Sequence, residues 1–330
     1  MNEHFSEKTF GNQHLLPNLP VPGLDETCDK FIEWVRPLLT QSEFSNTGKI
    51  VEAFLQPGGE GEKLQKELIR WSQQPDLPNW LEPFWDEKYL LSRPPLPINV
   101  NFSTACDEHP AAKGLSQVQR AAALIDLTLR FKSLLDKEKL AVDKDREGPL
   151  CMVQFKRLFS TTRIPGQDID WLRSPVLPDD PPSAAEKHIV VMHNVQIFAL
   201  DVLDDSSTPR SIGAIEAELT HILSLGAEKV PADQAVGVLT TMNRDKRAQA
   251  RKTLLQIDPQ NKASLDTIES ALFALCLDDF GPDTLDERFR AILHGSGRDR
   301  WFDKSFQFIV GKNGTWGANG EHSWLDGYPV

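Results

Sequence analysis

The chain has 330 residues, 40% of them hydrophobic and 25% charged, so it is long enough to bury a large core in one or two domains. Acidic residues outnumber basic ones by 48 to 36, and the formal net charge of −12 argues against a broad surface for nucleic acid or anionic lipid. No apolar run in the sequence approaches the roughly 20 residues that span a bilayer, so no transmembrane segment is expected.

The four cysteines, Cys28, Cys106, Cys151 and Cys276, are scattered along the chain. They form no CxxC pair and have no histidines at matching spacing, so the sequence predicts neither a metal site nor a disulfide framework. Residues 1–14 carry two glutamates and lack an apolar core, which argues against a secretory signal and against an Arg-rich transit peptide. We therefore expect an intracellular protein, with the cytoplasm favoured and mitochondrial or peroxisomal locations left open.

The first third of the chain is predicted to be mainly helical. Residues 1–24 form an extended lead-in, because the stretch LLPNLPVPGL places three prolines within six positions. A helix begins at Asp25, where acidic residues precede apolar residues at helical spacing. Further helices are expected at about 44–55, 61–73 and 80–91.

The rest of the chain alternates between strands and helices. Residues 188–203, HIVVMHNVQIFALDVL, predict two buried strands joined by a turn at His193-Asn194. Residues 306–324 predict a second hairpin around Asn313-Gly314. The remaining expected elements are a strand at 97–103, a helix at 116–140, a helix at 211–224, a strand at 235–241, and helices at 243–256 and 262–276. The predicted fold class is therefore α/β, with a mixed β-sheet flanked by helices.

One dense basic stretch occurs at residues 243–252, NRDKRAQARK. Its alternating charges at helical spacing predict a solvated helix face and not an anion-binding site. Together with the net negative charge, this pattern predicts that nucleic acid is not a partner.

The last residues, GEHSWLDGYPV, contain a candidate catalytic pair. Imidazole side chains in general titrate near neutrality, so His322 is a candidate for taking and returning a proton at physiological pH. The carboxylate of Asp326 could hold one nitrogen of this ring and leave the other free. Because a histidine near an aspartate is also common on protein surfaces, the spacing alone leaves both a catalytic and a surface interpretation open.

Two longer segments resemble the choline/carnitine acyltransferase family. LPNLPVPGLDET, residues 16–27, resembles the family's N-terminal signature. RWFDKSFQFIVGKNGTWGANGEHSWLDG, residues 300–327, resembles its second signature over the full length. Further segments resemble the family in the same order, at residues 117–124, 152–166, 188–192, 236–245 and 271–279.

This resemblance implies both a fold and a reaction. Residues 25–330 would form the family's N-terminal domain, which has a chloramphenicol acetyltransferase-like fold, and the C-terminal domain would be absent. The reaction would be reversible acyl transfer between coenzyme A and carnitine or choline, with carnitine favoured. No cofactor would be bound permanently, because coenzyme A, acyl-coenzyme A and the acceptor are substrates. His322 would be the general base, and no covalent acyl-enzyme would be needed.

The role of Asp326 has two interpretations. Its carboxylate could accept the N–H of His322 and fix the tautomer of the ring, as in hydrolase triads. Alternatively, Asp326 could pair with an arginine and shape the turn, while a backbone carbonyl orients His322. The resemblance assigns Gly327 to a tight turn in which a Cβ would clash.

Other residues at signature positions are expected to be structural. We expect Glu321, next to the candidate base, to form an ion pair and not to take part in catalysis. Arg300, Asp303 and Lys304 are expected to form a polar network that holds the strand leading to His322.

The resemblance covers only about the first half of the family's length. The later half supplies a Ser-Thr-Ser segment for the oxyanion, basic residues for the phosphates of coenzyme A, and groups that recognise the acceptor. The nearest local candidate, Ser160-Thr161-Thr162, matches a different family segment. We therefore expect the isolated chain to be a fragment that is inactive on its own. The competing hypotheses are a non-catalytic binding or regulatory module with the same fold, and an enzyme from another acyltransferase group that shares the His-x-x-x-Asp-Gly ending.

Overall fold

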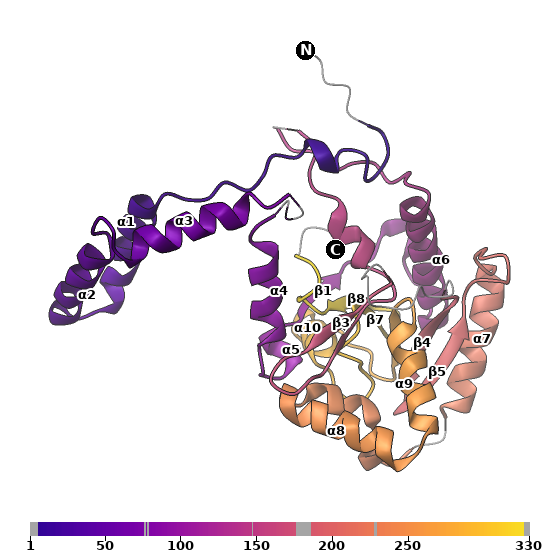
Figure 1. The fold of residues 1–330 in the computed structure, drawn as a ribbon. Coiled ribbons are helices and arrows are strands. Elements are labelled where there is room, and N and C mark those ends of the chain that lie inside the picture. Colours follow the sequence, from indigo (N-terminus) through magenta and orange to yellow (C-terminus); the bar gives the residue numbers. More distant parts are fainter. Residues whose placement is uncertain are drawn as a thin grey trace. The chain divides into compact units, whose positions relative to one another are not determined.

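The computed structural model describes residues 6–75, 77, 79–146, 148–175, 186–227 and 230–326 (Figure 1). The chain divides into two compact units, of which one consists of Pro17–Trp85 and the other of Met1–Leu16 together with Asp86–Val330. The boundary that the sequence analysis set at residue 24 remains a prediction.

The unit Pro17–Trp85 is built from helices. It contains α1 (Leu24–Val35), α2 (Gln41–Phe54) and α3 (Glu60–Ser72). The start of α2 is a capping box, in which the Glu43 amide donates to the Thr40 hydroxyl and the Thr40 amide donates to the Glu43 carboxylate at 2.9 Å. These helices confirm the predicted ones to within a few residues. The next helix, α4, spans Glu82–Leu90.

The larger unit contains a six-stranded sheet with the strand order β1-β8-β7-β6-β4-β5. Strand β6 runs parallel to β4 and β7, whereas the other neighbours are antiparallel. The sheet is therefore mixed, which confirms the predicted fold class. The strands are β1 (Phe102–Cys106), β4 (His188–His193), β5 (Gln196–Asp201), β6 (Ala274–Asp278), β7 (Phe306–Gly311) and β8 (Trp316–Gly320). A separate antiparallel pair is formed by β2 (Thr162–Ile164) and β3 (Trp171–Arg173).

Both predicted hairpins are present. Strands β4 and β5 pair over their full length, from His188↔Asp201 to His193↔Gln196, so the turn falls at residues 194–195. Strands β7 and β8 pair around Gly314, whose φ of 81° suits a glycine. The β7–β8 hairpin sets where the chain leaves the sheet, two residues before His322.

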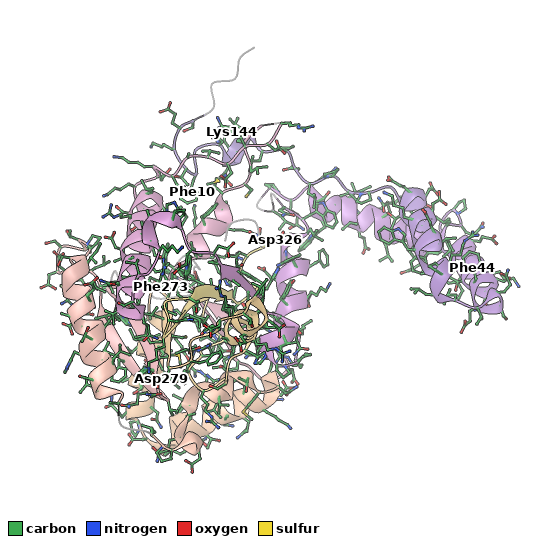
Figure 2. All side chains as sticks on the ribbon, turned by 180° about the vertical axis from the view of Figure 1, so that it is seen from behind. Phe10, Phe44, Lys144, Phe273, Asp279 and Asp326 are labelled. Carbon is green, nitrogen blue, oxygen red and sulfur yellow. The ribbon has the colours of Figure 1, made fainter. Side chains whose placement is uncertain are left out.

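Helices cover both faces of the sheet (Figure 1). On β4, Val191 belongs to the core that includes α6 (Gln117–Asp136) and α7 (Ile212–Leu225), as does Phe273, which Figure 2 shows inside this unit. The preceding residue, Val190, belongs to the core beneath α9 (Gln260–Ser270) and α10 (Leu285–Leu293). Neighbouring residues thus pack into opposite cores, as the alternation of side chains along a strand requires. Helix α8 (Arg244–Ile257) precedes α9.

Three predicted elements were wrong in type or extent. Residues 235–241, predicted as a strand, contain the 3₁₀-helix η6 (Val236–Thr241), in which the hydroxyls of Thr240 and Thr241 each donate at 2.7 Å to a carbonyl three residues earlier. Such local bonds offer the backbone an alternative to a sheet ladder. The predicted helix 262–276 ends at Ser270, and its apolar end becomes β6, because a short apolar run fits a buried strand as well as a helix.

The predicted strand at 97–103 begins later than expected. Residues Leu96–Asn99 form the short α5, inside which Ile98 has a φ of 71°, and β1 starts only at Phe102. The prolines at 95 and 97 remove backbone donors that a strand ladder would need. Within the described part of the chain, no helix is both long and apolar enough to cross a membrane.

The close packing at Gly317 gives a first testable prediction. A Cβ on Gly317 would lie 2.4 Å from the carbonyl oxygen of Thr104 and 2.3 Å from a methyl carbon of Ile292. Thr104 belongs to the paired strand β1, so its backbone cannot move aside. We expect Gly317→Ala to lower the free energy of unfolding by about 1–3 kcal/mol in urea titrations.

Gly213, on α7, is the matched control for this substitution. Nothing lies within 4 Å of a Cβ built there. Gly213→Ala should therefore be neutral or raise the stability by up to about 1 kcal/mol. If the two variants were equally stable, the close contacts at Gly317 would not be what requires a glycine there.

Candidate active site

His322 follows directly on the anchored end of the sheet. Gly320, the last residue of β8, pairs with Phe102 on β1 and with Phe306 on β7. The amide of the next residue, Glu321, donates to the carbonyl of Ser305 at 3.0 Å. The backbone is therefore held on both sides up to the residue before the candidate base.

Two aromatic rings fix the plane of the imidazole. The ring of Tyr89, in the last turn of α4, stacks on His322 with 5.1 Å between centroids and 5° between planes. The Phe102 ring meets the imidazole at 87°, with 5.4 Å between centroids. Stacked and edge-on contacts are both favourable arrangements of aromatic rings. The half-buried His322 thus has an orientation that is defined by two uncharged rings.

Gly320 leaves room for one of these rings. A Cβ at this position would lie 2.5–3.0 Å from three atoms of the Phe102 ring. Any side chain at position 320 would therefore displace the ring that packs against His322. The sequence analysis missed this role, although the signal was present as a glycine directly before Glu321.

Glu321 forms a buried ion pair, as expected. Its Oε1 lies 3.0 Å from Nη1 of Arg163, and both side chains are completely buried. Its Oε2 accepts hydrogen bonds from the backbone amide and the hydroxyl of Ser323. With both oxygens occupied, Glu321 stabilises the chain on either side of His322.

Arg163 belongs to a larger buried network of charges. Its Nε lies 2.7 Å from Asp170 Oδ2, and the same oxygen lies 2.6 Å from Nε of Arg244. Burial raises the pKa of Asp170, but the guanidinium groups of Arg244 and Arg163 lower it by more than burial raises it. The net result is a pKa below the usual range. Asp170 is therefore ionised and neutralises part of the positive charge.

The network extends to Asp303 and corrects one prediction. Asp303 accepts from Arg244 Nη1 at 2.6 Å and from Arg247 Nε at 3.2 Å. Both arginines come from the basic stretch 243–252, which the sequence analysis predicted to be a solvated helix face, yet both are 0% exposed. That prediction failed because their acidic partners lie far away in the sequence.

Arg300 and Lys304 are also buried and have polar partners, as the predicted polar network requires. Arg300 binds Asp278, at the end of β6, with two contacts of 2.7 Å. Lys304 donates to the Thr162 hydroxyl at 3.0 Å and to the Glu269 carbonyl at 2.8 Å. With the Asp303 contacts, these bonds confirm that the segment before β7 is held by a network of polar side chains.

Asp326 lies at the surface of the larger unit, where Figure 2 labels it. Its backbone amide donates to Gln154 Oε1 at 3.1 Å. The pKa of Tyr89 is raised first by burial and then by the negative charges of Asp326 and Glu321. The carboxylate of Asp326 therefore acts electrostatically on the ring that stacks on His322. Gly327 lies outside the described residues.

Sequence reasoning did not identify Tyr89, Phe102 or Arg163 as parts of the site. Arg163 is 158 positions away from its partner Glu321, a separation that no local pattern reports. Among the described residues, no group of three or more His, Cys, Asp or Glu side chains could hold a metal ion.

Comparisons with known proteins give a consistent result. A sequence model of the family described as Choline/Carnitine o-acyltransferase matches residues 19–330. Carnitine O-acetyltransferase of Columba livia is 34% identical over 332 residues, which are 97% of this chain and 51% of that protein. The peroxisomal carnitine O-octanoyltransferase of Bos taurus is 36% identical over 97% of this chain and 52% of its own length. Choline O-acetyltransferase of Mus musculus is 35% identical over 94% and 50%, respectively.

The chain thus spans about half the length of the curated relatives it matches. Carnitine and choline enzymes match it at nearly the same identity. Overall similarity therefore does not separate the carnitine enzymes from the choline enzyme among these relatives.

Lys304 gives a prediction about stability and pH. Burial lowers the pKa of this fully enclosed amine to about 7, well below the value of 10.5 for a free lysine. Between these two pH values the unfolded chain binds a proton that the folded chain lacks, so this group makes stability rise with pH, by at most about 1.4 kcal/mol per unit.

We expect Lys304→Met to abolish this contribution. In urea titrations from about pH 6 to about pH 9, the stability of the unmodified protein should rise relative to that of the variant. The exposed Lys312 offers a control, since Lys312→Met should leave the pH dependence unchanged. Parallel curves for the unmodified protein and Lys304→Met would contradict the prediction.

Proposed function

Because the chain belongs to the choline/carnitine O-acyltransferase family, we propose that it carries the general base, His322, for acyl transfer between coenzyme A and carnitine. The observation that supports this proposal most strongly is that the surrounding residues hold the imidazole in one orientation. His322 follows an anchored strand end, and its ring stacks on Tyr89 and lies nearly perpendicular to the ring of Phe102. A fixed, half-buried imidazole meets the geometric requirement for a general base.

The reaction needs two proton transfers, one from the acceptor hydroxyl to His322 and one from the imidazolium to the leaving sulfur. His322 removes the proton from the hydroxyl of the acceptor, and the oxygen attacks the carbonyl carbon of the acyl-coenzyme A thioester. A tetrahedral intermediate forms, the carbon–sulfur bond breaks, and the leaving sulfur takes the proton back from the imidazolium. The imidazole is regenerated without a covalent acyl-enzyme. In the reverse direction the same ring deprotonates the thiol of coenzyme A.

We propose a supporting role for Asp326 in this cycle. Asp326 lies four residues after His322, and its charge acts on Tyr89, whose ring stacks on the imidazole. A carboxylate near a histidine base also fixes the tautomer when it accepts the ring N–H. The alternative interpretation, in which Asp326 pairs with an arginine and only shapes the turn, predicts that Asp326→Asn leaves transfer unchanged. Gly327 is proposed to serve the turn that follows.

We propose carnitine as the acceptor by analogy with the two carnitine acyltransferases among the relatives named above. A choline-type acceptor is the alternative, given the match to choline O-acetyltransferase. Parallel assays with carnitine and choline as acceptors decide between them. Coenzyme A acts as a substrate here, and no permanently bound cofactor is proposed.

His322→Ala should lower the rate of acyl transfer by about 10²–10⁴-fold, the usual contribution of a positioned acid–base group. The release of coenzyme A thiol from acetyl-coenzyme A in the presence of carnitine measures this rate, in the natural protein at its full length. The control is His294→Ala, a substitution at another half-buried histidine, whose Nδ1 lies 2.8 Å from the Gly295 carbonyl. Undiminished thiol release by His322→Ala would refute the proposed function.

We also propose that residues 1–330 need further groups for turnover. The resemblance to the family implies that a Ser-Thr-Ser segment stabilises the oxyanion, and two of the three candidate hydroxyls in this chain are already engaged. Thr161 donates to the Ser174 hydroxyl at 2.8 Å, and Thr162 donates to the Glu269 carbonyl at 2.8 Å. Both threonines are at most 1% exposed, so they are not available to an oxyanion.

The 330-residue chain by itself should therefore transfer acyl groups slowly or not at all. The loss of one oxyanion donor typically lowers turnover by about 10²–10³-fold. Thiol release by residues 1–330, measured beside the His322→Ala variant of the same chain, tests this expectation. A robust rate that disappears in the variant would contradict it, and equal background rates would support it.

A further inference from the structure

Arg163 contacts both structural elements that enclose the candidate base. Its Nη1 binds Glu321, the residue before His322, at 3.0 Å. Its Nη2 donates to the backbone carbonyls of Tyr89 at 2.7 Å and of Ser92 at 3.2 Å. One guanidinium group therefore connects the strand end that presents the imidazole with the helix end that presents the stacking ring.

The contact with α4 uses a general property of helix ends. The last carbonyls of a helix lack intrahelical donors, and a cation near them is favourable. Tyr89 is the second-last residue of α4, so its carbonyl is one of these acceptors. The guanidinium thus holds the backbone at the residue whose ring packs on His322.

A third contact, made by Nε, fixes the orientation of the Arg163 guanidinium. Nε of Arg163 donates to Asp170 at 2.7 Å, and Asp170 is itself bound by Arg244 at 2.6 Å. The Arg163 side chain is completely buried, and its donors point in three directions within one plane. A lysine would retain the charge but could not reproduce this planar fork.

We propose that Arg163 is the positioning residue for His322, because its guanidinium sets the spacing between the Tyr89 ring and the imidazole. This role rests on the proposed function of His322 as the base, although the geometry can be measured without turnover. Because Arg163 is buried beneath Glu321, it acts through the backbone and the ring and not through substrate contact. A displacement of about 1 Å in a reacting group can lower a rate by about 10²-fold.

The proposal is tested with Arg163→Lys in protein labelled with ¹³C in the histidine rings. The chain has eight histidines, and the His322 signal is assigned by its loss in His322→Ala. We expect the ring signal of His322 in Arg163→Lys to move toward the position of an unstacked imidazole, because the shielding by the Tyr89 ring changes. In the transfer assay, kcat should fall by about 10²-fold with little change in KM.

Arg247→Lys is the matched control, because this arginine is as deeply buried and belongs to the same network. Its Nε lies 3.2 Å from Oδ2 of Asp303, and its guanidinium carbon lies 5.2 Å from the centroid of the Trp301 ring. We expect Arg247→Lys to lose stability while the ring signal of His322 stays in place. A shift in both lysine variants would indicate general loosening and would overturn the proposal.

An unshifted His322 signal in folded Arg163→Lys would also overturn the positioning role. If Arg163→Lys does not fold, Glu321→Gln decides, since it weakens the same link from the other side and should shift the same signal. Failure of the proposed function has a different result: His322→Ala would then leave thiol release unchanged, whatever the ring signal does in the other variants.

Discussion

The ion pairs of Asp170 and Asp303 with buried arginines are the constraint on which the arrangement of the site depends. The two carboxylates share Arg244, Asp170 also binds Arg163 and Arg93, and Asp303 also binds Arg247. A buried charge that loses its partner typically costs about 3–5 kcal/mol. The elements that carry these side chains therefore cannot separate independently, and they include β2, the start of α8 and the segment before β7.

The network holds the backbone next to His322, whereas the rings that pack on the imidazole belong to Tyr89 and Phe102. Charge reaches as far as Glu321, one residue before the imidazole, whereas the ring itself lies between aromatic side chains. Rigidity is thus supplied by ion pairs, and the immediate surroundings of His322 are supplied by Tyr89 and Phe102. This separation lets ion pairs hold the backbone firmly while the imidazole packs against uncharged rings.

Sequence reasoning predicted the elements whose signals are local. The two hairpins were predicted correctly because an apolar run and its turn lie within about 20 residues of each other. The element at 235–241 was predicted wrongly, since its threonine hydroxyls favour a 3₁₀ turn that a β-favouring composition conceals. His322 was found through the resemblance of its surrounding segment to a known family. The partners of Glu321 and Arg244 lie in distant segments, so no periodicity or spacing could have revealed them.

The pairing of β1 with β8 has a consequence for how the protein folds. Phe102 and Gly320 are paired neighbours in the sheet, yet they are more than two hundred positions apart in the sequence. Contacts between such distant segments pay a large loop-closure entropy before they gain energy, and they form late and slowly. During synthesis, the helices and the β4–β5 hairpin can form while the place of β8 between β1 and β7 is still empty. The imidazole therefore reaches Phe102 only after this long-range pairing has formed, and a chain without that pairing lacks the formed site.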